Sequence, residues 1–151
     1  MSTVDTATVA SPWHDGERAI QQRVGVAERM EAFGRKVIRS FIPDQHRAFY
    51  AQLPFLLAGA VDDAGRPWAT VIEGTPGFMH SPDPRTLVIG ARRAGDDPAL
   101  AGLTAGAAIG LLGIELHTRR RNRLNGTVSA LTDDGFAVRV GQAFGNCPQY
   151  I

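Results

Sequence analysis

The period of the hydrophobic pattern changes at Pro54, and this change limits what the chain can fold into. In residues 11–53 apolar side chains recur every three or four positions, which is the helical spacing. In residues 54–151 they form short runs and alternations separated by turn residues, the pattern of strands. We therefore expect a flexible tail over residues 1–10, helices over 11–53 and a β-barrel over 54–151, together making a single domain.

The apolar spacing in the first part predicts amphipathic helices. Ser11 and Asp15 are both suitable N-caps for the first of them, because their side-chain oxygens can accept orphan backbone N–H groups. Pro43 is expected to end the second helix. The three helices are predicted over residues 17–26, 27–41 and 44–52.

The second part predicts a mainly β fold. Residues 74–84 contain three prolines and two glycines, so this segment is predicted to be a loop. Strands joined by short turns favour a small antiparallel barrel, because closure removes exposed sheet edges. Six strands are predicted, over residues 55–61, 66–73, 85–90, 107–116, 119–131 and 136–144.

Composition excludes several classes of protein. The chain has 151 residues and a formal net charge of +1, which argues against a general nucleic-acid-binding role. A single cysteine, Cys147, excludes an internal disulfide framework, and we expect it to be a small buried filler. The start has no secretory signal, and the longest apolar run, residues 105–114, is too short to cross a bilayer. These features predict a soluble cytoplasmic protein that does not associate with membranes.

The most distinctive stretch is Thr-Arg-Arg-Arg-Asn-Arg-Leu-Asn-Gly, over residues 118–126. In a strand, side chains alternate between faces, so Arg119, Arg121, Arg123 and Asn125 would share one face. The other face would carry residues 120, 122 and 124. Such a concentration of guanidinium groups favours an anionic ligand, phosphate in particular. The alternative is a charged hairpin end in water, and the spacing alone does not separate the two.

These segments, taken in order, resemble a known family. The chain contains PFLLAGAVD, GRPWAT, PGFMH, TLVI, IGLLGIEL, TRRRNRLNG and FGNCPQYI. This order resembles the pyridoxamine 5′-phosphate oxidase-like split barrels that bind flavin mononucleotide (FMN), over residues 13–151. The arginine-rich segment and the last segment are the most specific. The last one is similar to a subgroup in which the barrel is sometimes fused to a flavin and iron–sulfur reductase module, and the apolar ending suggests a fragment of something longer.

The resemblance implies a six-stranded antiparallel Greek-key split barrel that forms a homodimer and holds two FMN molecules in clefts between subunits. It does not imply vitamin B6 chemistry, because the substrate-gripping C-terminal tail of the true oxidases has no counterpart here. The Ser-Arg-Lys cluster of those oxidases is also replaced, by residues 92–97. There Arg92 and Arg93 could complete a phosphate cradle, or Asp96 and Asp97 could pair with them or cap the next helix.

The resemblance also implies which residues would hold the cofactor. The second strand would contact the flavin mainly through its backbone, the end of the third strand would approach the phosphate, and the fifth strand and C-terminal segment would supply polar side chains. The candidates are Ala69, Thr70, Val71, Ile72, Glu73, Ile89, Arg92, Arg93, Arg121, Arg123, Asn125, Asn146 and Gln149.

Three functions are consistent with these predictions. The first is an FMN-dependent oxidoreductase that moves a hydride between flavin and a nicotinamide nucleotide or small organic substrate, with no side chain required as acid or base. The second is a non-catalytic flavin-binding or electron-transfer module that depends on a reductase partner. The third is a split barrel that binds another ligand, such as haem. No motif for a metal site is present in the sequence.

Overall fold

The computed structural model describes residues 10–92 and 95–147. The chain divides into two compact units, one up to Ile38 and one from Arg39 onward. The third helix therefore belongs to the same unit as the strands, whereas the sequence pattern grouped it with the first two helices.

The first unit is a pair of helices, α1 (Asp15–Arg23) and α2 (Ala27–Val37). Trp13 joins the chain before α1 to α2, because its indole Nε1 donates to the carbonyl oxygen of Met30 at 2.9 Å. Gly34 permits this contact, since a Cβ there would come within 2.6 Å of the Trp13 ring. Trp13 therefore holds the segment before α1 against α2.

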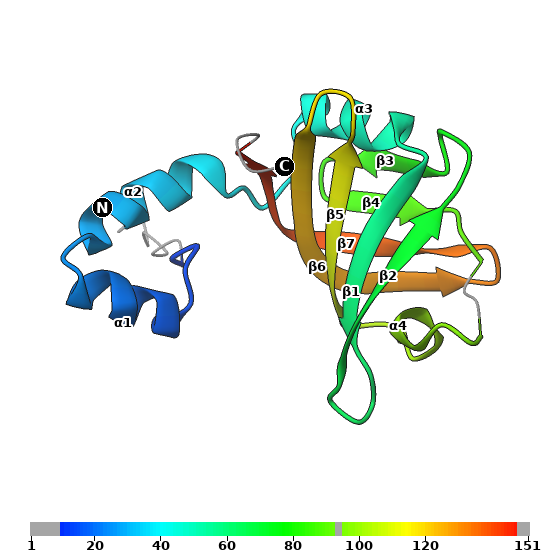
Figure 1. Cartoon of the computed structure of the whole chain (residues 1–151), viewed down its shortest axis with the longest axis horizontal. Coiled ribbons are helices and arrows are strands. Elements are labelled where there is room, and N and C mark those ends of the chain that lie inside the picture. The colour runs from blue at the N-terminus through cyan, green and yellow to red at the C-terminus, as the bar shows by residue number, and fades with distance from the viewer. Residues whose placement is uncertain (1–9, 93–94, 148–151) are drawn as a thin grey trace, which may run out of the picture. The chain divides into compact units, whose positions relative to one another are not determined.

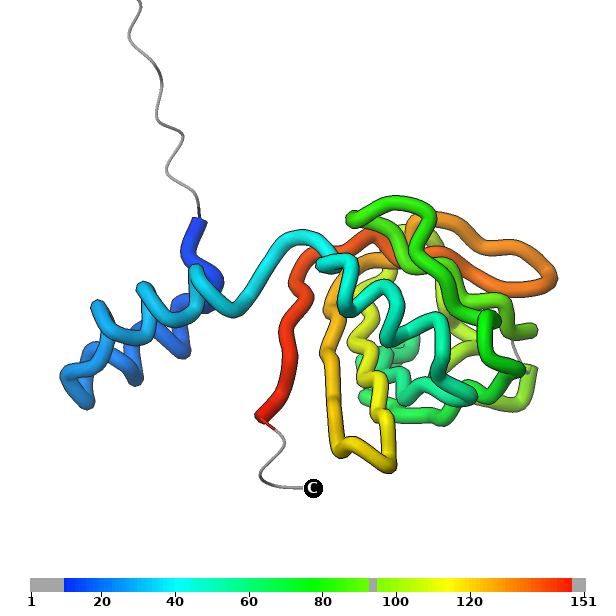
Figure 2. Tube along the Cα trace, turned by 90° about the horizontal axis from the view of Figure 1, so that it is seen from above, coloured from blue at the N-terminus to red at the C-terminus, as the bar shows by residue number. Residues whose placement is uncertain are grey.

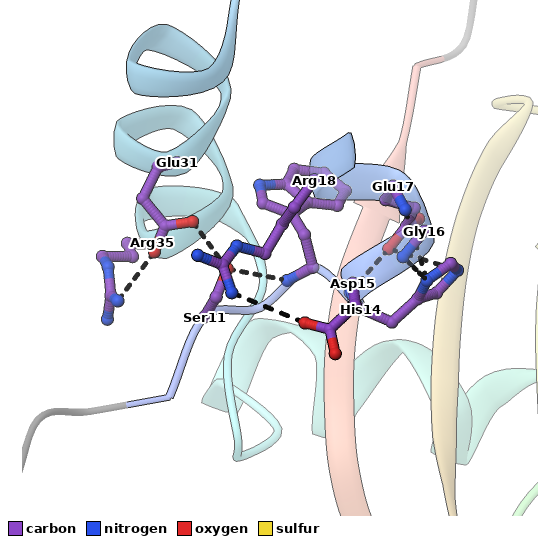
Figure 3. A network of polar contacts seen from close by, with 9 residues as sticks. Ser11, His14, Asp15, Gly16, Glu17, Arg18, Glu31 and Arg35 are labelled. Atoms are coloured by element: carbon purple, nitrogen blue, oxygen red, sulfur yellow. Dashed lines mark hydrogen bonds and ion pairs between the residues drawn. The ribbon is translucent and has the colours of Figure 1, made fainter. Parts of the chain in front are cut away.

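The cap of α1 differs from the sequence prediction. His14 is the N-cap: its Nδ1 accepts two first-turn backbone N–H groups at 3.0 and 3.3 Å. Its own N–H donates to the Glu17 carboxylate at 3.0 Å, completing a capping box. Ser11 and Asp15 were the wrong candidates. Ser11 instead donates to Glu31 on α2 at 2.6 Å, as part of the polar network in Figure 3.

The second helix is shorter than predicted and ends at Val37 rather than at residue 41. Arg39 exchanges two backbone hydrogen bonds with Ala143, at 3.0 and 2.7 Å, and Ile42 donates its N–H to the carbonyl oxygen of Pro84 at 2.7 Å. These partners require an extended backbone. A periodic pattern that continued past Val37 could not reveal them.

The second unit contains α3, α4 and a seven-stranded sheet in which neighbouring strands are antiparallel, in the order β2-β1-β5-β6-β7-β4-β3. Helices α3 and α4 flank the sheet at opposite ends of the unit (Figure 1). This mainly β, antiparallel architecture confirms the predicted split-barrel class. The elements are α3 (Asp44–Gln52), β1 (Phe55–Val61), β2 (Pro67–Glu73), β3 (Met79–Asp83), β4 (Thr86–Ile89), α4 (Pro98–Ala101), β5 (Ala108–Glu115), β6 (Arg120–Thr132) and β7 (Gly135–Asn146).

The predicted count of six strands was wrong by one, because β3 lies inside the segment expected to be a loop. Its Pro82 has no backbone N–H, which is tolerated only at an edge or a bulge. Both conditions hold: β3 is the last strand of the sheet, and its pairing with β4 shifts register between His80 and Asp83. The prolines therefore led to the prediction of a loop where the sheet has an edge strand.

Strands β6 and β7 bend midway, so each takes part in both halves of the sheet (Figures 1 and 2). The bend coincides with a register shift, since Asn125 pairs with Gln142 whereas Gly126 pairs with Val140. The backbones approach so closely here that a Cβ on Gly126 would lie 2.1 Å from the carbonyl oxygen of Arg139. Only glycine fits such a crossing.

The core lies inside the curve of the sheet, beneath α3. Tyr50 is buried, and its hydroxyl donates to the backbone carbonyl of Asn122 at 3.0 Å, which fixes α3 to β6. Burial raises the pKa of this phenol well above its usual value. The other large side chains that are fully buried are Ile42, Phe49, Leu56, Met79, Leu87, Ile89, Leu124, Val128 and Val138.

We predict that Gly126→Ala destabilises the second unit by about 2–3 kcal/mol or more, because its new methyl group meets backbone and must force the strands apart. Urea unfolding followed by tryptophan fluorescence measures the loss. Gly102→Ala is the control, since it follows α4 at φ −89° with open space around it. Equal stability of the two variants would contradict this account of the bend.

Candidate functional site

On one face of the sheet formed by β2, β1, β5, β6 and β7, the side chains are only partly buried. Register aligns Val71, Leu57, Leu112, Arg123 and Phe144 in one row across the five strands. All five side chains are half-buried or exposed, whereas the alternate positions are turned into the core. We call this surface the outer face. The next row is Ala69, Gly59, Gly110, Asn125 and Gln142.

Strand β2 forms one edge of the sheet, and no strand within the described residues pairs with its far side. Two bonds bracket its pairing with β1: Asp62 N–H to Arg66 O and Gly74 N–H to Pro54 O, both at 3.0 Å. Hydrogen-bonded pairs alternate along an antiparallel ladder, so the even-numbered residues of β2 bond to β1. The odd-numbered residues Ala69, Val71 and Glu73 therefore direct their backbone N–H and C=O groups to the open edge.

Thr70 anchors this edge strand to the segment after β4. Its hydroxyl donates to Asp97 Oδ2 at 2.5 Å, and Asp97 Oδ1 accepts the N–H of Ala99 at 2.8 Å as the N-cap of α4. The aspartate therefore caps the helix, one of the alternatives that the sequence left open. Arg92, which follows β4, is exposed.

The alternation predicted for the arginine-rich strand is confirmed. Asn122 and Leu124 are buried, while Arg123 and Asn125 are exposed on the outer face, where Asn125 Nδ2 donates to Gln142 Oε1 at 3.3 Å. Arg119 was wrongly assigned to this row: it precedes β6 and has φ 61°, so it belongs to the turn. No carboxylate of the described residues forms an ion pair with Arg123.

Arg120 lies on the opposite side and is not merely solvated, since its guanidinium carbon is 5.1 Å from the centroid of the Phe49 ring on α3. A cation over an aromatic face gains both electrostatic and packing energy. The pKa of His46 on α3 is lowered, mainly because its imidazole is partly buried and further because the positive charges of Arg39 and Arg120 lie nearby. These side chains therefore support the α3 contact rather than the outer face.

Two buried polar atoms on the outer face have no hydrogen-bond partner among the described residues: Nε of Arg121, a donor, and Oδ1 of Asn146, an acceptor. The two residues are paired across β6 and β7. Arg121 keeps its position because its Nη2 donates to the backbone carbonyl of Cys147 at 2.7 Å. An adjacent free donor and acceptor complement a ligand edge that has one carbonyl and one N–H.

The remaining candidates separate clearly. Ile72 and Ile89 have buried side chains that belong to the core. Cys147, expected to be buried, is exposed. Arg93 and Gln149 lie outside the described residues. The candidates on the sheet thus form two groups, one on β2 and one on β6 and β7. Strands β1 and β5 lie between β2 and β6. Three strand spacings therefore separate the two groups, a distance of about 14 Å.

A shallow pocket of about 410 Å³ is lined by Gly59 and Gly110 on β1 and β5, by Trp68 on β2 and, of the candidate residues, by Asn125. The Trp68 ring is fixed by its Nε1, which donates to Asp62 at 2.9 Å. This bond, followed by bonds from Arg66, holds the pKa of the Asp62 carboxyl well below its usual value. Val61, an exposed apolar residue, also lines the pocket.

The sequence analysis considered Asp97 as a cap for the next helix, which it is, or as a partner for arginine, but not as an acceptor for Thr70. The Asp-Pro pair before α4 is a helix-start signal, but nothing local in the sequence indicates the bond to Thr70. The same holds for the contact of Arg120 with Phe49. Both depend on segments that meet only after the sheet has formed.

Comparison with known proteins identifies the family. The family model described as pyridoxamine 5′-phosphate oxidase matches residues 42–149, more than two thirds of the chain. The matched region includes the open edge of β2, the connection after β4 and the arginine-rich strand. A comparison with curated proteins found no match. No helix within the described residues is long and apolar enough to span a membrane.

Solved structures share the fold at low sequence identity. A putative pyridoxamine 5′-phosphate oxidase from Lactobacillus delbrueckii is 15% identical, with 70% of this chain and 95% of that chain covered and a TM-score of 0.53. HupZ from Group A Streptococcus is 12% identical, with 69% and 93% covered and a TM-score of 0.52. An FMN-binding protein from Syntrophomonas wolfei is 13% identical, with 84% and 97% covered and a TM-score of 0.51.

We predict that Thr70→Val loosens β2. The substitution keeps the side-chain shape but removes a hydrogen bond to a carboxylate, so the free energy of unfolding should fall by about 1–2 kcal/mol. Backbone amides of β2 should also exchange with solvent faster. Thr127→Val is the matched control, because Thr127 is exposed on β6. If both variants keep the stability and exchange of the parent, the Thr70–Asp97 bond does not hold the edge strand.

Proposed function

Because this chain belongs to the pyridoxamine 5′-phosphate oxidase family, we propose that it binds FMN on the outer face and acts as an FMN-dependent oxidoreductase. The observation that carries the proposal is that two buried atoms, Arg121 Nε and Asn146 Oδ1, have no hydrogen-bond partner within the part of the chain that the structure describes. The pyrimidine part of the flavin ring offers carbonyl acceptors and an imide N–H. One donor and one acceptor side by side complement that edge.

The open edge of β2 fits the same cofactor. Backbone N–H and C=O groups of Ala69, Val71 and Glu73 point away from β1, where they are available to a ligand that carries both donors and acceptors. Such contacts leave no side-chain signature. Arg92, exposed after β4, supplies a guanidinium for the phosphate, since its planar fork suits that group.

We further propose that the complete site forms between two copies of the chain. The β2 group and the β6 group lie on the same sheet but are about 14 Å apart across two strands. A second copy facing the outer face would bring its own Arg121 and Arg123 toward the first copy's β2. The half-exposed apolar side chains of that face support burial in a dimer.

Bound FMN would supply hydride and electron transfer, as flavins do in enzymes. The protein residues would bind and orient the cofactor, and the apolar outer face of a second copy would exclude water. The other reactant would be a nicotinamide nucleotide or a small organic molecule. Anaerobic bleaching of the bound flavin by NADH or NADPH tests this activity. Bleaching only with an added reductase would instead indicate an electron-transfer module.

We predict that Arg121→Ala weakens FMN binding by roughly ten- to a hundredfold, because one charge-assisted hydrogen bond is worth about 1.5–3 kcal/mol. Arg121→Lys should recover only part of the loss, since lysine lacks the planar fork. Arg123→Ala should also weaken binding. Quenching of flavin fluorescence during titration measures each affinity at two ionic strengths.

Arg119→Ala is the matched control for this series, because Arg119 lies in the turn before β6. It should change affinity less than about twofold, and mostly at low salt, as solvated charges do. If Arg121→Ala and Arg123→Ala bind FMN as the parent does, β6 is not part of the flavin site.

The dimer is tested separately. Light scattering at micromolar concentration should give about twice the 16.2 kDa mass of the chain. Val71→Asp places a charge at an exposed apolar position of the outer face and should shift the mass toward that of one chain. Ala32→Asp, at an exposed position on α2, is the control because it adds the same charge elsewhere. A monomeric parent at these concentrations would contradict the shared site.

A further inference from the structure

A second pocket, which the function proposed above does not use, adjoins the outer face: two residues of its lining, Phe55 and Ile114, pair with Glu73 and Arg121. It has a volume of about 250 Å³ and lies where α3, β1 and the end of β5 meet. We call it the Glu115 pocket. Its lining is Gln52, Leu53, Pro54, Phe55, Ile114, Glu115, Leu116 and His117.

The residues that line the Glu115 pocket are mostly apolar, but one of them, Glu115, carries a carboxylate. The Glu115 side chain is 9% exposed. It accepts hydrogen bonds from the Gln52 amide and the Thr118 hydroxyl, both neutral. Within the described residues, the one basic group at ion-pair distance is the His117 imidazole, whose Nε2 lies 4.0 Å away and whose side chain is 80% exposed.

The arginine that is best placed to pair with Glu115, Arg120, has another partner. Arg120 faces Glu115 across the β5–β6 ladder, yet its guanidinium lies over the Phe49 ring instead. Glu115 therefore has no arginine partner among the described residues. A carboxylate buried without a close cation carries a large desolvation cost. A cation that enters the pocket would offset that cost.

We propose that the Glu115 pocket binds a small ring compound that carries a protonated amine. The ring would pack against Pro54, Phe55 and Ile114, and the ammonium would donate to the Glu115 carboxylate. An apolar cavity of about 150 Å³ accommodates benzene, so 250 Å³ suffices for one ring and an aminomethyl group. Because Phe55 pairs with Glu73 and Ile114 with Arg121, the amine would lie beside the proposed FMN site.

Benzylamine is the probe, with benzyl alcohol as its neutral counterpart. Each is titrated into the full-length protein while the ring signals of the four histidines are followed by NMR. Benzylamine should shift the His117 signal with a dissociation constant on the order of 1 mM. Signals of His14, His46 and His80 should stay in place. Benzyl alcohol should bind at least about tenfold more weakly, because it cannot form the charged bond.

Glu115→Gln should weaken benzylamine binding by at least about tenfold and leave benzyl alcohol binding nearly unchanged. Glu28→Gln removes the same charge from an exposed position on α2 and should change neither. If Glu115→Gln does not fold, the comparison of amine with alcohol on the parent protein still decides. Equal binding of the two compounds, no saturable shift of His117, or equal shifts of all four histidines would overturn the proposal.

Discussion

The close approach of two backbones at Gly126 and Arg139 is the constraint on which the rest of the barrel depends. It lets β6 turn sharply and still pair with β7 on both sides of the bend. Leu124 before the bend and Val128 after it are both buried, so one strand supplies core to both halves of the sheet. The candidate side chains of β6 all precede the bend, which keeps them on the outer face.

The two groups of candidate residues use different chemistry. Strand β2 offers backbone donors and acceptors at an open edge, and the hydrogen bond from Thr70 to Asp97 fixes that edge in place. Strand β6 offers guanidinium and amide groups on a central strand, held by pairing on both sides. Backbone groups recognise the shape and polarity of a ligand edge, whereas arginine adds charge. A ligand with a planar polar ring and a phosphate needs both.

Much of this could be predicted from local pattern. The alternation of Arg123, Leu124 and Asn125 reports a strand with one buried face, because a pleated backbone turns successive side chains to opposite sides. What failed depended on distant partners. The extended segment at Arg39 needs Ala143, and β3 is a strand only because it pairs with β4. The unpartnered atoms of Arg121 and Asn146 likewise follow from the register of β6 and β7.

The open edge of β2 also matters for the chain on its own, since an unpaired strand edge can recruit strands from other molecules and start aggregation. The sequence limits this hazard at both ends of the strand. Pro67 begins β2 and offers no N–H to an incoming strand, and Glu73 ends it with a charge on the exposed side. Between them only a short run of backbone is left to pair. Few backbone groups of β2 are therefore left to start growth into a fibril-like sheet.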